Sequence, residues 1–497
     1  MSPAPNVYNV PNLHRVLWHA GLHRDADPIE ETTRPFLVVP GGATWTYGEM
    51  AVRSQRFATV LRDRGVAPGD RVIAQVTKSV DAVALYLACL QVGAIQVPLN
   101  TAYTGAELAH FVEDATPTLV VRDAAEDAGQ TAFAHLCADA DGADPDVRAT
   151  DRRGSDLAMM LYTSGTTGRS KGAMLSHDAL IANGRGLAGI WEFDRSDVLL
   201  HVLPIFHVHG LFVALHCAML SGASVFFCER FDVDQTIDLL PASTVMMGVP
   251  THYSRLLTSD RFDELACRSI RLFTSGSAPM TEQVHDEFTE RTGHRIVERY
   301  GMTECGIITS NPVRGDRIPG TVGYALPKTE VRVRVDDERD AAPGETGIVE
   351  MRGPGLMEGY WNRPEATAAE MRDGDWFVTG DVGSLDETGR LTLQGRAGDM
   401  IISGGYNVYP KEIELILDDV DGVEESAVVG VPHPDFGEGI VAVIVGDVTD
   451  EAMQDALGAL ARFKHPRRFV RVAELPRNAM GKVQKQVLRS ELSDSFG

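Results

Sequence analysis

Several features that mark other classes of protein are missing from this sequence. Its few cysteines show no CxxC or CxH pairing, which argues against both a zinc site and a disulfide framework. No apolar run approaches the length of a membrane span, and the first residues lack the basic and apolar regions of a signal peptide. We therefore expect a reduced, cytoplasmic setting and no membrane partner.

Positive charge is also scarce. The 46 lysines and arginines stand against 70 aspartates and glutamates, so the formal net charge is −24 at pH 7. This balance disfavours binding to nucleic acid or to an anionic membrane surface. An anionic substrate would have to be held by local donors, because the overall field of the protein repels it.

The patterns that are present predict a large α/β protein. A chain of 497 residues exceeds a single compact core, so two or more domains are expected. Short β-branched runs such as 71–76 alternate with helical runs such as 80–90, which is typical of βαβ units in a parallel or mixed sheet. Residues 331–393 indicate a small β subdomain, and the last hundred residues indicate a small α+β domain. The Asp-rich stretch 123–156 is interpreted as a solvated connection without function.

A glycine-rich loop at residues 162–172 follows a short apolar run. Its glycines allow tight turns, while its hydroxyls and Lys171 supply donors, a combination suited to a polyphosphate. It is not a P-loop, because the lysine falls three residues after the second glycine and no Ser or Thr follows it. Taken alone, such a loop is more typical of a solvated turn than of a nucleotide site.

The loop resembles the phosphate-binding loop of the adenylate-forming enzymes, which include acyl-CoA synthetases, peptide-synthetase adenylation domains and luciferases. Four further stretches match that family in the same order, and together they span essentially the whole chain. They are the turn 204–210, the run 299–304, the pair 379–381 and 395–396, and the segment 478–485. Singly, each could be an ordinary turn or surface segment, but their joint order favours the family.

The resemblance implies sites for ATP and Mg²⁺, with coenzyme A as cosubstrate. Lys482 would bridge the substrate carboxylate and the α-phosphate, and Glu304 would help to hold Mg²⁺; the two cations, Lys482 and Mg²⁺, would compensate for the approach of two anions. The implied ATP-binding residues are Thr163, Ser164, Gly165, Thr166, Thr167, Gly168, Lys171, Tyr300, Thr303, Asp381 and Arg396. The implied catalytic residues are His207, Thr303, Glu304 and Lys482.

The resemblance also implies a domain rotation. In this family the small domain turns between the two half-reactions, which moves the catalytic lysine out and a thioester-forming face in. The corresponding boundaries here would be 1–396, with a β subdomain at about 320–395, and 397–497. The hinge falls near Gly398, where many members carry Lys or Asp. Glycine permits the rotation, but any charge contact of the usual residue is absent.

Arg299 indicates which class of carboxylic acid is the substrate. It comes just before the tyrosine expected at the adenine, at a depth where an aliphatic acyl chain would have to pass. A buried guanidinium needs an anion, and a second carboxylate on the substrate is the natural candidate. Ser277, His207 and Met302 would line the same pocket. The alternative is that Arg299 pairs with Glu298 or another acid of the protein.

Residues 247–251, 275–279, 298–304 and 309–312 resemble the malonyl-CoA synthetases, which join malonate, and often methylmalonate, to coenzyme A. Without a carrier-protein domain in the chain, free coenzyme A is the expected acceptor, although a separate carrier protein stays open. A broader short-chain or aryl acid ligase is an alternative. A catalytically silent nucleotide-binding regulator is disfavoured, because the implied catalytic residues are all present. Lys482 is also a candidate for acetylation, with an acetyltransferase and a deacetylase as partners.

Overall fold

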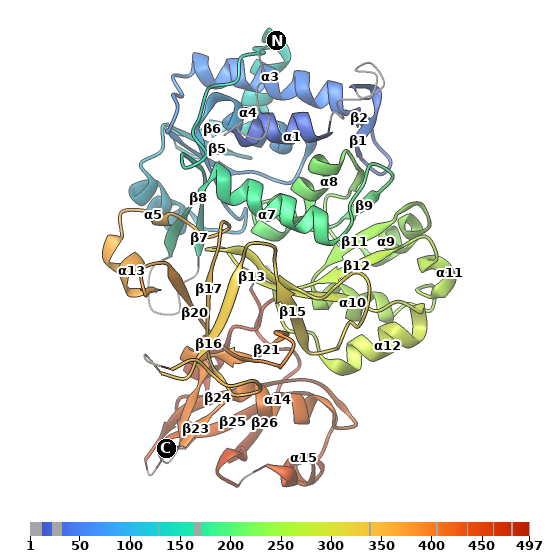
Figure 1. Cartoon of the computed structure of the whole chain (residues 1–497), viewed down its shortest axis with the longest axis vertical. Coiled ribbons are helices and arrows are strands. Elements are labelled where there is room, and N and C mark those ends of the chain that lie inside the picture. Colours follow the sequence, from blue (N-terminus) through green and yellow to red (C-terminus); the bar gives the residue numbers. More distant parts are fainter. Residues whose placement is uncertain are drawn as a thin grey trace.

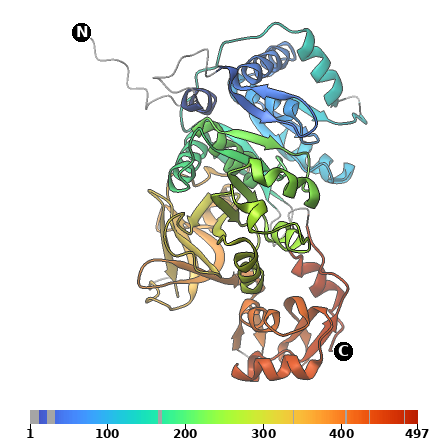
Figure 2. The same ribbon diagram turned by 90° about the vertical axis from the view of Figure 1, so that its right-hand side faces the viewer.

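Three β-sheets organise the computed structural model, which describes residues 12–21, 32–127, 129–163, 170–336, 339–403, 406–434, 436–460, 462–478 and 481–496. The first two sheets lie side by side in the upper and middle parts of the molecule (Figure 1), and the third forms the lower end in both views (Figures 1 and 2). Among the described residues, no helix has both the length and the apolar character needed to span a membrane.

The seven-stranded sheet has the order β18-β8-β7-β4-β3-β5-β6. Its central strands are parallel and joined by helices, which confirms the predicted βαβ units. Its strands are β3 (Arg71–Gln75), β4 (Ile95–Pro98), β5 (Leu119–Arg122), β6 (Thr131–Ala132), β7 (Leu157–Thr163), β8 (Lys171–Ser176) and β18 (Gly359–Tyr360), with helices α3 (Tyr47–Asp63), α4 (Val80–Val92), α5 (Gly105–Ala115) and α6 (Phe133–Gly142). The antiparallel pair β7 and β8 flanks the glycine-rich loop.

The stretch 123–156 departs from the prediction of a solvated connection, because it contains β6 and α6. Phe133, Leu136 and Ala140 recur at helical spacing and are buried, and α6 packs on α3. The outer face of α6 carries the aspartates that made the stretch look solvated. One of them, Asp141, forms an ion pair of 2.6 Å with Arg53 of α3.

The fourteen-stranded sheet carries most of the sequence motifs. Strands β13, β12, β11, β9, β10 and β1 are successive parallel neighbours, and antiparallel strands extend the sheet from β14 to β16. Its strands are β1 (Pro35–Val38), β2 (Thr44–Thr46), β9 (Val198–His201), β10 (Ser224–Phe227), β11 (Val245–Gly248), β12 (Leu272–Ser275), β13 (Val297–Met302), β14 (Gly306–Ser310), β15 (Thr321–Ala325), β16 (Glu330–Arg334), β17 (Gly347–Arg352), β19 (Met371–Arg372), β20 (Trp376–Leu385) and β21 (Leu391–Arg396). The helices around it are α1 (Leu13–Gly21), α7 (His177–Ile190), the π-helix η2 (His209–Ala214), α8 (Leu215–Ser221), α9 (Val233–Leu239), the 3₁₀ turn η3 (Leu240–Ala242), α10 (Pro250–Leu257), α11 (Glu264–Cys267), α12 (Glu282–Thr292) and α13 (Pro364–Ala369).

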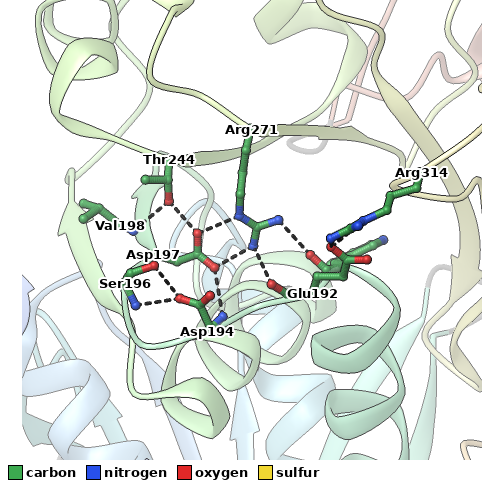
Figure 3. Close-up of polar contacts among 9 residues, drawn as sticks. Glu192, Asp194, Ser196, Asp197, Val198, Thr244, Arg271 and Arg314 are labelled. Atoms are coloured by element: carbon green, nitrogen blue, oxygen red, sulfur yellow. Dashed lines mark hydrogen bonds and ion pairs between the residues drawn. The ribbon is translucent and has the colours of Figure 1, made fainter.

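An ion pair between the half-buried Arg271 and the buried Asp197 ties the amino-terminal ends of three parallel strands together (Figure 3). Arg271, just before β12, donates to Asp197 Oδ1 at 2.8 Å and Oδ2 at 2.5 Å, and Asp197 precedes β9. Thr244, just before β11, donates to Asp197 Oδ1 at 2.7 Å and accepts the Val198 N–H at 2.9 Å. The ion pair therefore stabilises the end of these strands that lies away from their carboxyl-end turns.

The carboxyl-terminal region forms a third sheet with apolar clusters of its own. It consists of β22 (Ile401–Ser403), β23 (Tyr406–Val408), β24 (Val423–His433), β25 (Gly437–Gly446) and β26 (Arg468–Arg471), with α14 (Pro410–Asp418), α15 (Asp450–Ala456) and α16 (Lys485–Glu491), and with single 3₁₀ turns η4 (Ala397–Asp399), η5 (Leu457–Ala459) and η6 (Arg462–Lys464). The predicted α+β character is confirmed. The predicted hinge residue Gly398 lies in η4, between β21 and this sheet.

Candidate active site

Arg299 is buried at the carboxyl end of the parallel strands. The side chain is 5% exposed and lies directly over Gly276, where an added Cβ would be 2.6 Å from Arg299 Cζ. A side chain at position 276 would therefore displace the guanidinium from this point. Among the residues that the structure describes, neither Arg299 Nε nor Nη2 has a hydrogen-bond partner. Burial lowers the pKa of Arg299 to about 9, so the group is still charged at neutral pH.

Two histidines and a serine surround the guanidinium. Ser277 has a φ of 70°, and its Oγ lies 3.4 Å from His209 Nδ1. The His209 N–H donates to His207 Nδ1 at 3.3 Å. Burial, together with the charge of Arg299, lowers the pKa of His207 to about 4 and that of His209 well below its usual value. Both imidazoles are neutral at pH 7, so they act as donors or acceptors and add no positive charge.

Glu298 does not neutralise its neighbour. Successive side chains of a strand point to opposite faces, and Glu298 Oε1 accepts the N–H of Gly320 at 3.1 Å on the face away from Arg299. No ion pair joins Arg299 to an acid anywhere in the described part of the chain. Burial raises the pKa of Glu298 to about 8. The alternative considered from the sequence, an Arg299–Glu298 pair, has no support in the geometry.

The nucleotide residues predicted by resemblance converge from separate strands. Arg396 Nε lies 2.8 Å from Asp381 Oδ1 across the β20–β21 pair, and the Tyr300 hydroxyl of β13 donates to Asp381 Oδ2. Asp381 and Tyr300 are buried. A carboxylate held in this way can accept from ribose hydroxyls while the ring of the tyrosine supplies a flat apolar surface.

The Lys482 segment lies against this group. An added Cβ on Gly481 would be 3.2 Å from Thr251 Oγ1 of α10, so the carboxyl-terminal loop touches the large region here. Lys482 keeps solvent-exposed surface, but the protein around its ammonium reduces hydration. This desolvation, with repulsion from Arg396, lowers the pKa of Lys482. The structure therefore brings Lys482 to the nucleotide residues, as a step at the α-phosphate would require.

A second network joins the loop lysine to Glu304. Lys171 Nζ lies 2.6 Å from Glu370 Oε1 and 4.0 Å from the centre of the Tyr360 ring. The Tyr360 hydroxyl is 2.9 Å from Glu304 Oε1 and 2.5 Å from Glu370 Oε2. Glu304 is buried and offers a carboxylate, the hard oxygen ligand that Mg²⁺ prefers. The residues present thus fit a magnesium ion held jointly with nucleotide phosphates.

The structure places some of the remaining predicted residues, and others lie outside the part that it describes. Met302 ends β13 and Thr303 lies in the turn after it, next to Glu304; both are half-buried. Thr163 ends β7 opposite Lys171. Ser164, Gly165, Thr166, Thr167 and Gly168 lie outside the described residues. Sequence reasoning missed His209, Tyr360 and Glu370. His209 stood in the quoted turn 204–210, whereas Tyr360 and Glu370 are placed only by the pairing of β18 with β8, which no local pattern predicts.

Known protein families, relatives and solved structures resemble this chain over most of its length. Residues 28–361 match the model of the AMP-binding enzyme family, and residues 412–482 match that of the AMP-binding enzyme C-terminal domain. The indoleacetate–CoA ligase of Aromatoleum aromaticum is 35% identical over 95% of this chain and 96% of its own, and the malonate–CoA ligase of Arabidopsis thaliana is 32% identical over 91% and 85%. The crystal structure of ATP-bound MatB from Rhodopseudomonas palustris superposes with a TM-score of 0.92 at 44% identity, covering 98% of this chain and all of that one.

The chain belongs to the AMP-binding, adenylate-forming enzyme family. Within that family it is an acid–thiol ligase of the acyl-CoA ligase type, a class that uses ATP, Mg²⁺ and coenzyme A.

Proposed function

We propose that this protein joins malonate to coenzyme A, and that it also accepts methylmalonate. The observation that carries the proposal is the buried guanidinium of Arg299, whose Nε and Nη2 lack hydrogen-bond partners among the described residues. An unpaired buried charge is costly, and a carboxylate at the far end of the acid would pair with it. Ser277, His207 and His209 stand beside it as neutral polar groups that can add hydrogen bonds.

In the first half-reaction an oxygen of the other carboxylate attacks the α-phosphorus of ATP, and the bond to pyrophosphate breaks. Lys482 lies where it can hold the attacking carboxylate and an α-phosphate oxygen together, and its positive charge offsets their repulsion. Tyr300, Asp381 and Arg396 hold the nucleoside. Bound Mg²⁺ would neutralise charge on the phosphates, with Glu304 as its ligand from the protein.

In the second half-reaction the sulfur of coenzyme A attacks the acyl carbon, the bond to AMP breaks, and the thiol proton is lost to solvent. We infer that residues 397–497 turn about a hinge near Gly398 between the two steps, as the two-domain division 1–396 and 397–497 implies. The support is local: an added Cβ at Gly398 would meet no atom within 4 Å, so this point of the chain is not packed.

A broader aryl acid ligase is the second candidate, and the 35% identity to an indoleacetate–CoA ligase favours it. An aryl acid has no second carboxylate, so it would leave Arg299 unpaired in the complex.

The six cysteines are all free thiols, which supports the cytoplasm as the compartment. The exposed surface of Lys482 likewise supports acetylation of this residue as a means of control.

The test is AMP formation from ATP and Mg²⁺ with malonate, methylmalonate, acetate, benzoate and indoleacetate, each with and without coenzyme A. We expect strong thiol-dependent turnover with the two dicarboxylates only. Preference for the monocarboxylates would overturn the assignment of the acid while leaving the ligase class intact.

A further inference from the structure

Lys78 makes a set of contacts that the proposed chemistry does not use. It lies between β3 and α4, on the seven-stranded sheet, and reaches across to the end of β9 on the fourteen-stranded sheet. Its Nζ is 2.7 Å from His201 Nδ1 and 3.0 Å from the His201 carbonyl oxygen. The same ammonium stands 4.5 Å from the centre of the Phe227 ring. The Lys78 ammonium is therefore hydrogen-bonded to both the ring and the backbone carbonyl of His201.

The other side of the His201 ring holds the turn that contains His207 and His209. His201 Nε2 is 2.9 Å from the carbonyl oxygen of Gly210. A carbonyl can only accept, so Nε2 carries the proton and Nδ1 accepts from Lys78. Burial and the charge of Lys78 lower the pKa of His201 well below its usual value, so the ring stays neutral. The hydrogen bonds therefore run in one direction, from Lys78 through His201 to Gly210.

Gly210 is a point where the turn has no freedom to move. A Cβ added there would lie 2.0 Å from the carbonyl oxygen of Pro204, so the backbone packs on itself at this residue. Gly210 also lies in the first turn of the π-helix η2, whose wide hydrogen-bonding pattern departs from that of the flanking α8. Holding its carbonyl fixes the position of His209 just before it and of the turn back to His207.

We propose that Lys78 is a positioning residue for the acid site, which acts through His201 and the carbonyl of Gly210 to hold His207 and His209 beside Arg299. This rests on the proposed function only in the choice of malonate as the assay acid. Loss of the ammonium should loosen the two histidines where they face the acid, while the nucleotide residues on β13, β20 and β21 keep their contacts.

The surroundings of Lys78 make this contact sensitive to pH. Besides His201, the titratable groups that face it are Cys228 and Glu229 after β10, and His252 of α10, which is neutral because burial lowers its pKa to about 4. Burial lowers the pKa of Lys78 itself to about 7. Lys78 is protonated below that pH and loses its positive charge as the pH rises through it. Binding of the acid should therefore weaken on the alkaline side.

The experiment compares Lys78→Met, Lys78→Arg and wild type by malonate-dependent ATP–pyrophosphate exchange from pH 6 to 9. Methionine keeps the length of the side chain and removes its charge. We expect kcat/KM for malonate to fall about 10- to 100-fold in Lys78→Met, as for loss of one charge-assisted hydrogen bond, with KM for ATP unchanged. Lys78→Arg should keep most of the activity and lose the decline between pH 7 and 8, because arginine stays charged.

Arg271→Met is the matched control, because it removes a cation from the opposite ends of the same parallel strands, away from the acid site. If it lowers kcat/KM for malonate as much as Lys78→Met at an equal loss of thermal stability, the role of Lys78 is only structural and the proposal is wrong. A decline of wild-type size between pH 7 and 8 in Lys78→Arg would also overturn it, whereas a decline nearer pH 9 is common to all the variants because Arg299 has a pKa of about 9. If wild type prefers another acid, the proposal that malonate is the substrate is wrong. The role of Lys78 is then tested by assaying wild type, Lys78→Met and Lys78→Arg with that acid.

Discussion

Arg299 is the side chain on which the choice of substrate depends. We predict that Arg299→Met lowers kcat/KM for malonate by roughly two to three and a half powers of ten, because the distal carboxylate would be buried without its partner, a loss of about 3–5 kcal/mol. The KM for ATP should not change, since Tyr300 and Asp381 are untouched. Steady-state kinetics with both substrates measure this.

The control for that variant is Arg295→Met, which removes an exposed arginine just before the same strand. It should behave like wild type. If Arg299→Met kept wild-type activity with malonate, the guanidinium would have no role in binding the acid.

Glu298, the residue before Arg299, should make the stability of the protein depend on pH. Its pKa is raised to about 8 in the folded protein from an ordinary value near 4.5. Between these values the folded state holds a proton that the unfolded state has released, so this residue's contribution to stability falls as the pH rises from 4.5 to 8. Glu298→Gln stays neutral and still accepts the Gly320 N–H. We expect it to be more stable than wild type by at least about 2 kcal/mol at pH 8 and equal to it at pH 4.5.

Urea unfolding at the two pH values measures this difference. A variant that gains the same stability at both would show that the gain comes from packing, and that the ionisation of Glu298 has no part in it.

At the scale of elements, the ion pair in Figure 3 holds β9, β11 and β12 together at one end. We predict that Arg271→Met lowers the free energy of unfolding by about 3–5 kcal/mol, because Asp197 is 3% exposed and would be left as an uncompensated buried charge. Replacing both residues, as Asp197→Asn with Arg271→Met, should recover part of that loss. Thermal denaturation of wild type, Arg271→Met and the double variant measures these differences. Equal stability of the three proteins would mean that the ion pair contributes nothing to stability.

The strands and their carboxyl-end turns could be predicted from sequence, because each apolar run is short and is followed by a polar turn. Alternation along β13 could also have excluded the Arg299–Glu298 pair, since neighbours on a strand face opposite ways. The missed features depend on long-range pairing. Tyr360 and Glu370 reach Lys171 only because β18 adds to β8, and α6 was obscured because it lies within an Asp-rich stretch and buries only three apolar residues.

At the scale of the whole molecule, the described carboxyl-terminal residues touch the rest at α14 against β21 and at a few other places. One is Gly481 against Thr251, and another is a cleft lined by Glu282 of α12 with Leu415 and Asp418 of α14. Sparse contacts of this kind are compatible with a domain that moves. The single covalent route between the two parts runs through η4 and Gly398.

We predict that Gly398→Ala keeps both half-reactions, because the added Cβ has open space. Gly398→Pro should form the adenylate at the normal rate but transfer it to coenzyme A much more slowly, since proline fixes φ near −65° and removes the freedom that rotation needs. Single-turnover assays that follow pyrophosphate and thioester separately show the split. Normal thioester formation in Gly398→Pro would mean that the rotation uses another joint.

The pairing of distant strands also bears on how the protein is made. Leu37 of β1 pairs with Val225 of β10, and Ala173 of β8 pairs with Tyr360 of β18. Neither large sheet can close until the ribosome has delivered the later partner, so the early strands wait with unpaired edges, which are prone to aggregation. Among the described residues, the last sheet pairs within 401–471 alone and has no such delay. Strands β20 and β21 complete the fourteen-stranded sheet only at Arg396, so newly made chains should need chaperone protection most before residue 396 emerges, and little after it.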